Sequence, residues 1–278
     1  MPGRRTVVIG DRNVLSTIRP APTEGHHIEL VLRSAHRDPQ ALAAALGAND
    51  PDAVVVFDPR PGEGEALARA GLPVAAWLIP PSPESGMRPD LSPFSLILAT
   101  DAQTAARAGG NESTLMTLPV SDMLLIASPN FDVIERAFFD GAASDRRDRF
   151  LQPVKHRFDV LHLISGASDA QLRDLMARCQ IAIDLQSEHD LPARDRVGPG
   201  LAAGMLILAE RPLEEPGLVE GEHLLTFSEP DELELLIEGA IAEPDAFSEI
   251  RRAGHDAVQQ RRSSLVLKQL TDELLATA

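Results

Sequence analysis

The sequence predicts an α/β protein in which two sets of parallel strands follow one another along the chain. Three observations support this prediction. Short apolar runs alternate with helix-like stretches almost throughout, the alternation restarts near residue 120, and a length of 278 residues suits two compact domains. Continuous apolar strands separated by helices are typical of a parallel sheet that is covered by helices on both faces.

The first strand–helix set fills the N-terminal 120 residues. The segment 11–25 is short and rich in proline, so it leaves little room for a first crossover helix. Asp101 stands directly before a helical stretch, where its side chain can accept from a free N–H group as an N-cap. Strands are expected at 6–10, 28–32, 52–57, 73–79, 94–99 and 113–119, and helices at 38–48, 62–71 and 101–110.

The second set begins near residue 121. A strand is expected at 122–128 and a helix at 129–142. Ser168, beside Asp169, is a plausible N-cap for the helix at 168–179. Further strands are expected at 158–164, 180–186, 205–210 and 223–227, and the chain becomes helical after Phe227. The predicted domains are therefore 1–120 and 121–278, with C-terminal helices packing back.

The bulk composition excludes several classes of function. The apolar fraction of 44% and the charged fraction of 24% are those of a soluble globular protein. With 26 basic and 42 acidic residues the net charge is −16, which disfavours nucleic acid as a partner. No apolar run reaches the roughly 18 residues of a membrane span, and the start of the chain reads as a first strand. Cys179 is the only cysteine and lies in an apolar context, so we expect a buried, inert thiol and a cytoplasmic protein.

A glycine motif at 198–204 resembles a phosphate-binding loop. A dinucleotide fingerprint needs a strand directly before the first glycine, a full helix after it and an acid about 20 residues further on. Here a loop of about ten residues follows the strand, the helix has room for about two turns, and Glu210 comes too early. A dinucleotide cofactor at this position is therefore disfavoured.

The same motif can still bind an anion. Gly198 and Gly200 allow close approach of the backbone to a ligand, and free N–H groups at Gly200 and Leu201 would face a phosphate at a helix N-terminus. Arg194 and Arg196 lie just before and could clamp a diphosphate.

A simpler interpretation of the motif is equally supported. In that interpretation the two arginines pair with Asp190 and Asp195 on the surface, and the two glycines serve close packing.

Three other residues are candidates for the chemistry of a site. Glu188 could hold a hydroxyl group of a ligand and His189 could move a proton, although a solvated polar loop is the simpler interpretation of each. Asp11 follows the first strand and could serve as a base or orient a substrate. The adjacent histidines at 26–27 point to opposite faces of an extended chain, so they are expected to be structural and no metal site is predicted.

The segment from about 168 to 260 resembles the C-terminal half of GT-B glycosyltransferases, most closely the group related to spore-maturation CgeB-type proteins. The resemblance rests on "SDAQLRDLMARCQIAIDLQSEHD", "RVGPGLAAGMLILAERP" and "GLVEGEHLLTFSEPDELELLIEGAIAEPDAFSEIRRAGHDAV". The family's short helix carries a glutamate that holds the ribose of a nucleotide-sugar, and here that position is Pro199. Proline has no side-chain acceptor for a ribose hydroxyl.

The resemblance implies two Rossmann-like domains that face each other across a cleft. It implies a bacterial, metal-independent and cofactor-free glycosyltransferase. The N-terminal domain would take the acceptor and offer Asp11, and the C-terminal domain would bind the nucleotide-sugar. The alternative is a catalytically inactive GT-B-like protein that acts as a binding or scaffold partner, which the proline at position 199 favours.

Overall fold

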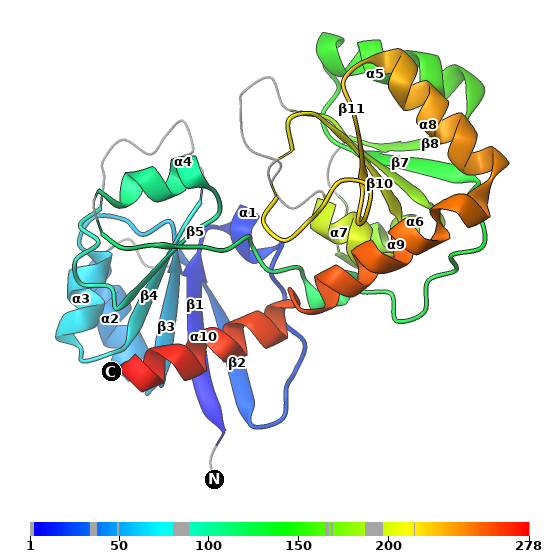
Figure 1. The fold of residues 1–278 in the computed structure, drawn as a ribbon. Coiled ribbons are helices and arrows are strands. Elements are labelled where there is room, and N and C mark those ends of the chain that lie inside the picture. Colours follow the sequence, from blue (N-terminus) through cyan, green and yellow to red (C-terminus); the bar gives the residue numbers. More distant parts are fainter. Residues whose placement is uncertain are drawn as a thin grey trace. The chain divides into compact units, whose positions relative to one another are not determined.

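The computed structural model describes residues 3–33, 38–48, 50–79, 89–109, 111–164, 167, 169–186, 197–213 and 215–277. The chain divides into two units by its internal contacts. The first unit ends at Pro119 and is completed by the segment that begins at Arg262, and the second unit is Val120–Arg261. Each unit holds one parallel sheet with helices on both faces (Figure 1).

The described residues of the first unit form a six-stranded parallel sheet in the order β2-β1-β3-β4-β5-β6. Its inner strands consist of β-branched and other apolar residues that are buried on both faces, as a doubly covered parallel sheet requires. The strands are β1 (Arg4–Gly10), β2 (His26–Leu32), β3 (Ala53–Phe57), β4 (Val74–Leu78), β5 (Leu96–Ala99) and β6 (Thr114–Leu115).

The helices of the first unit divide between the two faces because successive strand side chains point in opposite directions. Val7 and Ile9 of β1 pack with α2 (Pro39–Gly47), α3 (Glu63–Arg69), α4 (Ala102–Ala105) and η2 (Ala106–Ala108). Val8 of β1 packs on the other face with α1 (Arg12–Leu15) and α10 (Ser263–Thr277). The single turn of α1 agrees with the prediction that 11–25 holds no full crossover helix. Asp101 is confirmed as an N-cap, since its Oδ1 accepts from Thr104 N at 2.7 Å.

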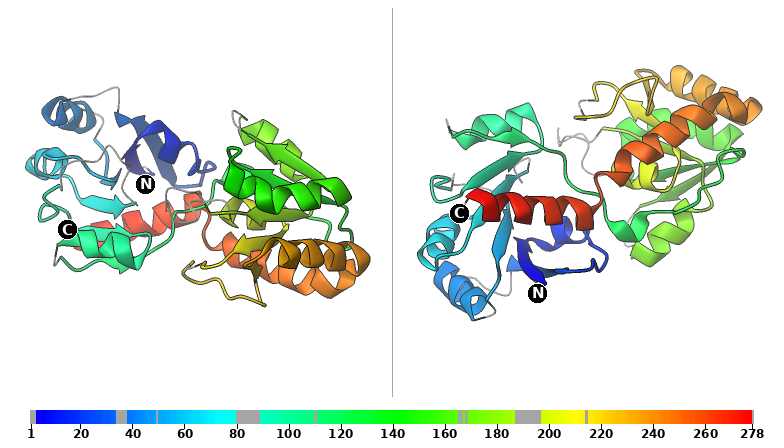
Figure 2. Two further views of the ribbon diagram at one scale, coloured as in Figure 1. Left: turned by 90° about the horizontal axis from the view of Figure 1, so that it is seen from above. Right: turned by 60° about the horizontal axis from the view of Figure 1, so that its bottom comes forward.

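The last helix corrects the predicted domain limits. The sequence analysis assigned 121–278 to one domain, but the segment from Arg262 onward belongs to the first unit. The reason is that α10 lies along the first sheet (Figure 2). The buried residues of α10 join the core of that sheet around Val8, Val55 and Trp77. These residues of α10 are Val266, Leu267, Leu270 and Leu274. The prediction that C-terminal helices pack back therefore holds for α10.

The second unit contains a five-stranded parallel sheet in the order β11-β10-β9-β7-β8. Its strands are β7 (Arg136–Asp140), β8 (Asp159–Leu163), β9 (Ile181–Asp184), β10 (Leu206–Glu210) and β11 (Leu225–Phe227). On one face, α5 (Asp145–Arg157) and α8 (Pro230–Ala242) cover Phe139, Ile183 and Leu208. On the other, α6 (Asp169–Met176), α7 (Val197–Ala202) and α9 (Pro244–Gln259) cover Phe138, Ala182 and Ile207 (Figure 1).

Two predictions at the start of the second unit are wrong. The segment 122–128 is no strand, because Ser121 accepts from Met123 N and starts the short 3-10 helix η3 (Asp122–Leu124). Leu124 is buried and Leu125 and Ile126 pack partly buried against the core, whereas Met123 is exposed, so the run is a connecting segment. The predicted helix at 129–142 is replaced by strand β7, which pairs with β8 and β9.

Two further predictions concern the membrane and the cysteine. Among the described helices, none is long and apolar enough to cross a membrane. Cys179 is buried, as expected, and burial raises the pKa of its thiol to about 11. The predicted N-cap Ser168 lies outside the described residues.

Candidate functional site

The strand order of the first sheet defines where a ligand can enter. The chain after β1 goes to the face of α1, whereas the chain after β3 goes to the face of α3. Because β1 and β3 are neighbours, the chain leaves their carboxyl ends toward opposite faces of the sheet, and such a switch point is the usual ligand position in open parallel sheets. Asp11 follows β1 and Asp58 follows β3, so both acids lie at this switch point.

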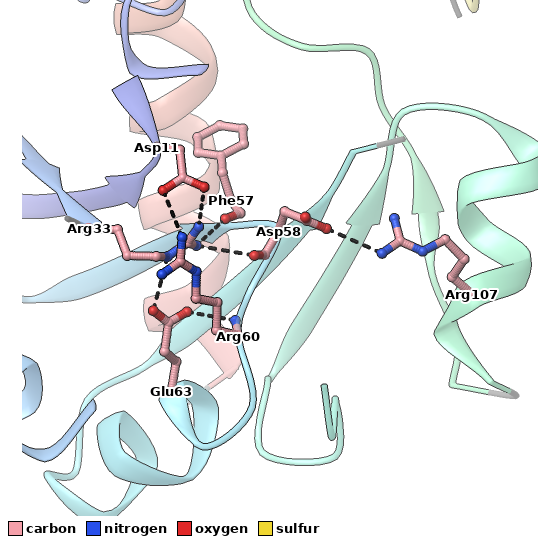
Figure 3. A network of polar contacts seen from close by, with 7 residues as sticks. All are labelled: Asp11, Arg33, Phe57, Asp58, Arg60, Glu63 and Arg107. Atoms are coloured by element: carbon pink, nitrogen blue, oxygen red, sulfur yellow. Dashed lines mark hydrogen bonds and ion pairs between the residues drawn. The ribbon is translucent and has the colours of Figure 1, made fainter. Parts of the chain in front are cut away.

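A network of charged groups occupies this edge of the first sheet (Figure 3). Its centre is Arg33, 2% exposed, which follows β2. Arg33 donates from Nε to Glu63 Oε1 and from Nη1 to Asp11 Oδ2, both at 3.0 Å. Arg60 Nη2 donates to Asp11 Oδ1 at 3.2 Å. Asp11 therefore has an arginine on each carboxylate oxygen, while half of its side chain stays exposed.

The backbone at Asp58 belongs to the same network. Its φ of 44° lies in the left-handed region, which aspartate tolerates better than most residues. Arg33 Nη2 donates to the carbonyl oxygens of Phe57 and Asp58, the latter at 3.2 Å. Arg107 Nη2 lies 3.4 Å from Asp58 Oδ1, and Arg107 Nη1 donates to Ile79 O at 2.6 Å. The network therefore connects the carboxyl ends of four strands, β1, β2, β3 and β4.

The second sheet has an equivalent switch point between β7 and β9. The chain after β7 goes to the face of α5, and the chain after β9 leads to α7 on the opposite face. Arg146, in the first turn of α5, reaches this edge and forms an ion pair with Glu210 at the end of β10. It also donates to Gln186 O at 3.1 Å, and Gln186 N donates to Glu210 Oε2 at 2.9 Å. About a third of the Arg146 side chain is exposed there.

Arg147 holds the loops on both sides of this second switch point. Its Nη1 donates to Ala142 O at 2.9 Å, and its Nη2 donates to Leu185 O at 3.5 Å. Arg147 is buried, in contrast to its neighbour Arg146. The loop after β7 and the end of β9 are thus tied together, with the Arg146 guanidinium as the partly exposed cation.

The glycine motif occupies the start of α7. A Cβ atom on Gly198 would lie 2.6 Å from Val120 Cγ2, and one on Gly200 would lie 2.6 Å from Ile207 Cδ1. Both glycines are therefore required by close packing, as the simpler interpretation expected. Leu201 is fully buried in the core of the second unit. Since α7 begins at Val197, the N–H groups that a helix leaves free would come from its first residues and not from Gly200 or Leu201.

The remaining predicted site residues, Glu188, His189, Arg194 and Arg196, lie outside the described residues. The acids Asp190 and Asp195 do so too. The predicted clamp on a diphosphate stays a prediction.

The sequence analysis missed Arg33, Arg146 and Glu210. Each lies at or near the carboxyl end of a strand or in the first turn of the helix that follows one. A charged residue at the end of an apolar run, or directly after it, was the available signal for Arg33 and Glu210. Arg146 gave no such signal, because its helix was not predicted.

The sequence predicted no metal site. The described parts of the chain hold no group of three or more His, Cys, Asp or Glu side chains that could bind a metal ion. His26 is buried and His27 is exposed, which agrees with opposite faces of one strand.

The sequence comparison agrees with the geometry of the second unit. Residues 146–265 match the family model described as glycosyl transferase-like, and the matched segment includes both Arg146 and Glu210. A search of curated proteins by sequence finds no match.

Solved structures share the fold over the whole chain. A glycosyltransferase from Rickettsia africae matches with a TM-score of 0.64 and 11% identity, over 100% of each chain. HepE from Anabaena, in complex with UDP, matches with a TM-score of 0.60 and 13% identity, over 99% of this chain and 100% of that one. Sucrose-phosphate synthase from Thermosynechococcus elongatus matches with a TM-score of 0.58 and 10% identity, over 99% of this chain and 100% of that one. The α/β fold with two parallel sheets is therefore that of GT-B glycosyltransferases, as predicted. That the two units face each other across a cleft stays a prediction.

Proposed function

We propose that this protein transfers a sugar from a nucleotide-sugar donor to an acceptor. The observation that carries the proposal is that the glycosyl transferase-like match, at residues 146–265, covers most of the second unit, where a partly exposed arginine, Arg146, reaches the sheet's switch point. A UDP-sugar is the proposed donor, because HepE, which shares the fold, was solved with UDP and with UDP-glucose.

In this proposal the second unit binds the donor diphosphate. Arg146, Arg194 and Arg196 supply positive charge, and the first turn of α7, at Val197 and Gly198, supplies backbone N–H groups in place of the predicted Gly200 and Leu201. Such fixed donors stabilise the negative charge that develops on the departing diphosphate, so no metal and no cofactor is required. Glu188 would hold a sugar hydroxyl and His189 would take part in proton transfer.

The first unit is the proposed acceptor side. Asp11 is exposed on one half of its side chain and lies at the switch point of the first sheet. A carboxylate there can accept a hydrogen bond from an acceptor hydroxyl and so orient it or assist its deprotonation.

The decisive experiment is calorimetric titration of the full chain with UDP, GDP, dTDP and CMP. We expect one of them, UDP above all, to bind, and its affinity to fall about tenfold or more when one charged contact is removed in Arg146→Met or Arg196→Ala. Arg149→Met is the matched control, because Arg149 is an exposed arginine on the same helix as Arg146. Absence of binding to every nucleotide, with a folded protein, would contradict the proposal.

A second function is favoured by the residues of α7. Pro199 stands where the resemblance implies a ribose-binding glutamate, and Gly198 and Gly200 are accounted for by packing alone. These features fit a catalytically inactive GT-B-like binding or scaffold protein. Nucleotide binding without transfer or donor hydrolysis would favour this second function over the first.

The finer assignments also belong to the proposal. Membership of the CgeB-type group rests on the resemblance over residues 168–260. A bacterial source, a cytoplasmic location and the identity of the acceptor stay predictions.

A further inference from the structure

The buried Arg33 makes more bonds to acids than the neutralisation of its charge requires. A buried guanidinium needs an acid nearby, because an unpaired charge in the interior costs much of a protein's stability. Glu63, which is 3% exposed, already supplies that acid at 3.0 Å. The bond from Arg33 to Asp11 is a second one, and it is directed at a carboxylate that is half exposed.

The position of Asp11 gives an independent reason to look for a role. Asp11 is the N-cap residue of α1, yet its side chain makes no capping hydrogen bond. The aspartates at the equivalent positions of α2 and α4, Asp38 and Asp101, both cap their helices. The usual structural explanation therefore accounts for Asp38 and Asp101 and fails for Asp11, whose carboxylate turns to Arg33 and Arg60 instead (Figure 3).

The Arg33 guanidinium also fixes Asp58, the second acid at this switch point. It donates to the carbonyl oxygen of Asp58, whose φ of 44° is a sparsely populated backbone conformation. Backbone strain of this kind gathers at binding and catalytic sites, where the surrounding contacts enforce it. Arg33 thus determines the placement of both Asp11 and Asp58 at the switch point between β1 and β3.

The charge balance of the network indicates the chemistry of its ligand. Among the described residues, three arginines, Arg33, Arg60 and Arg107, face three acids, Asp11, Asp58 and Glu63. The charges of these six side chains balance, so together they favour neither an anion nor a cation. Each Asp11 oxygen accepts from one arginine and keeps a further lone pair, and Arg60 is more than half exposed. Acceptors and donors side by side suit hydroxyl groups, which both donate and accept.

We infer that Arg33 is a positioning residue that holds Asp11 and Asp58 to bind the hydroxyl groups of a neutral, sugar-like acceptor. This inference rests on the proposed glycosyltransferase function and names the acceptor class for it. Arg33 itself is buried and acts through Asp11.

The test uses a double-mutant cycle in the full chain. UDP-glucose, UDP-galactose and UDP-N-acetylglucosamine serve as donors, and the methyl glycosides of glucose, galactose and mannose serve as neutral acceptor probes, with UDP release as the signal. Arg33→Lys keeps a positive charge beside Glu63 but cannot reach Asp11 and Asp58 together, because lysine lacks the planar fork of arginine. Asp11→Asn removes the carboxylate charge.

We expect Arg33→Lys to raise the KM for the methyl glycoside about tenfold, the effect of one lost charged hydrogen bond, and to leave the KM for the UDP-sugar within about twofold. Asp11→Asn should raise the acceptor KM by a similar factor. In the Asp11→Asn background, Arg33→Lys should raise the acceptor KM little further, since both changes act on the Asp11 carboxylate. The control is Arg69→Lys, at an exposed arginine on α3 outside the network. Circular dichroism and Tm identify variants that fail to fold. If Arg33→Lys fails to fold, Arg60→Lys replaces it, because Arg60 is an exposed partner of Asp11.

The outcomes separate this inference from the proposed function. Equal effects of Arg33→Lys in both backgrounds, or an equal rise in donor and acceptor KM, would show a structural role only and overturn the inference. Transfer to water or to an aromatic alcohol, with no transfer to any methyl glycoside, would overturn the acceptor class. A wild-type chain that binds no nucleotide and transfers no sugar overturns the proposed function and this role of Arg33 with it.

Discussion

Arg146 in the first turn of α5 forms an ion pair with Glu210, the last residue of β10, across 64 positions of the sequence. Glu210 is 5% exposed, so its carboxylate depends on this partner and on the N–H group of Gln186. The pair connects the helix that follows β7 to the end of β10. Its removal has a consequence for stability that is independent of any ligand.

We expect Arg146→Met to lower the free energy of unfolding by about 2 kcal/mol, because it leaves a buried carboxylate without its cation. Denaturation in urea measures the change. Arg149→Met, at an exposed position of the same helix, should change the free energy of unfolding by less than about 0.5 kcal/mol. Equal losses in both variants would contradict this role for the pair.

The buried His26 predicts a pH dependence of stability. Burial above all, with help from Lys268 and Arg4, lowers the pKa of His26 in the folded protein. Its Nε2 lies 2.8 Å from Thr6 Oγ1, and its Nδ1 has no partner among the described residues. The unfolded chain binds the proton more readily, so this contribution is complete above a pH of about 6.5 and is lost as the pH falls through the lower folded value.

The measurement is the free energy of unfolding between pH 7.5 and 5. Wild type should lose at most about 1.4 kcal/mol per pH unit from this group, and His26→Gln should flatten that part of the curve. His27→Gln, at the exposed neighbour, should retain the wild-type slope. The same slope in all three proteins would assign the pH dependence to other groups.

Gly198 predicts a packing defect with a specific rescue. Gly198→Ala places a Cβ 2.6 Å from Val120 Cγ2, so we expect a loss of about 1–3 kcal/mol from overpacking. Adding Val120→Ala removes the opposing methyl groups, and the double variant should lose less than the sum of the two single variants. Gly47→Ala is the control, because no atom lies within 4 Å of its added Cβ. Thermal unfolding of wild type and the four variants measures these differences.

Cys179 should be inert in the folded protein. With its thiol pKa raised to about 11 by burial, only about one molecule in a thousand carries a thiolate at pH 8. Ellman's reagent should label less than a tenth of the protein in an hour and one equivalent after unfolding in guanidinium, on the order expected for a buried thiol. Rapid labelling of the native protein would contradict the buried position.

The strands of the first unit could be predicted because their apolar runs are long, β-branched and bounded by turn residues. The start of the second unit could not. The apolar run at 122–128 is a connecting segment that packs on the core through Leu125 and Ile126, and such a run cannot be told from a strand by pattern alone. Helix α5 contains Pro153 and many charged residues, with Phe150, Leu151 and Val154 as its buried face, so its weak pattern hid it.

The candidate sites were harder to predict for a different reason. Asp11 was predicted from its place after a strand, and the first sheet confirms that place. Its partners Arg33 and Arg60 lie 22 and 49 positions away, and only the order of strands in the sheet brings them together. Sequence position gives the end of a strand but not its neighbours, so a network that crosses three strands stays invisible until the sheet is known.

The return of α10 to the first sheet makes the second unit an insertion into the first. Val120 N donates to Arg261 O at 2.8 Å, so the inserted segment starts and finishes at one hydrogen bond. Residues 120–261 can therefore be excised as a single gene fragment with adjacent ends. A fragment that stops at residue 119 would instead lack the apolar face of α10 and expose Val8, Val55 and Trp77 to water.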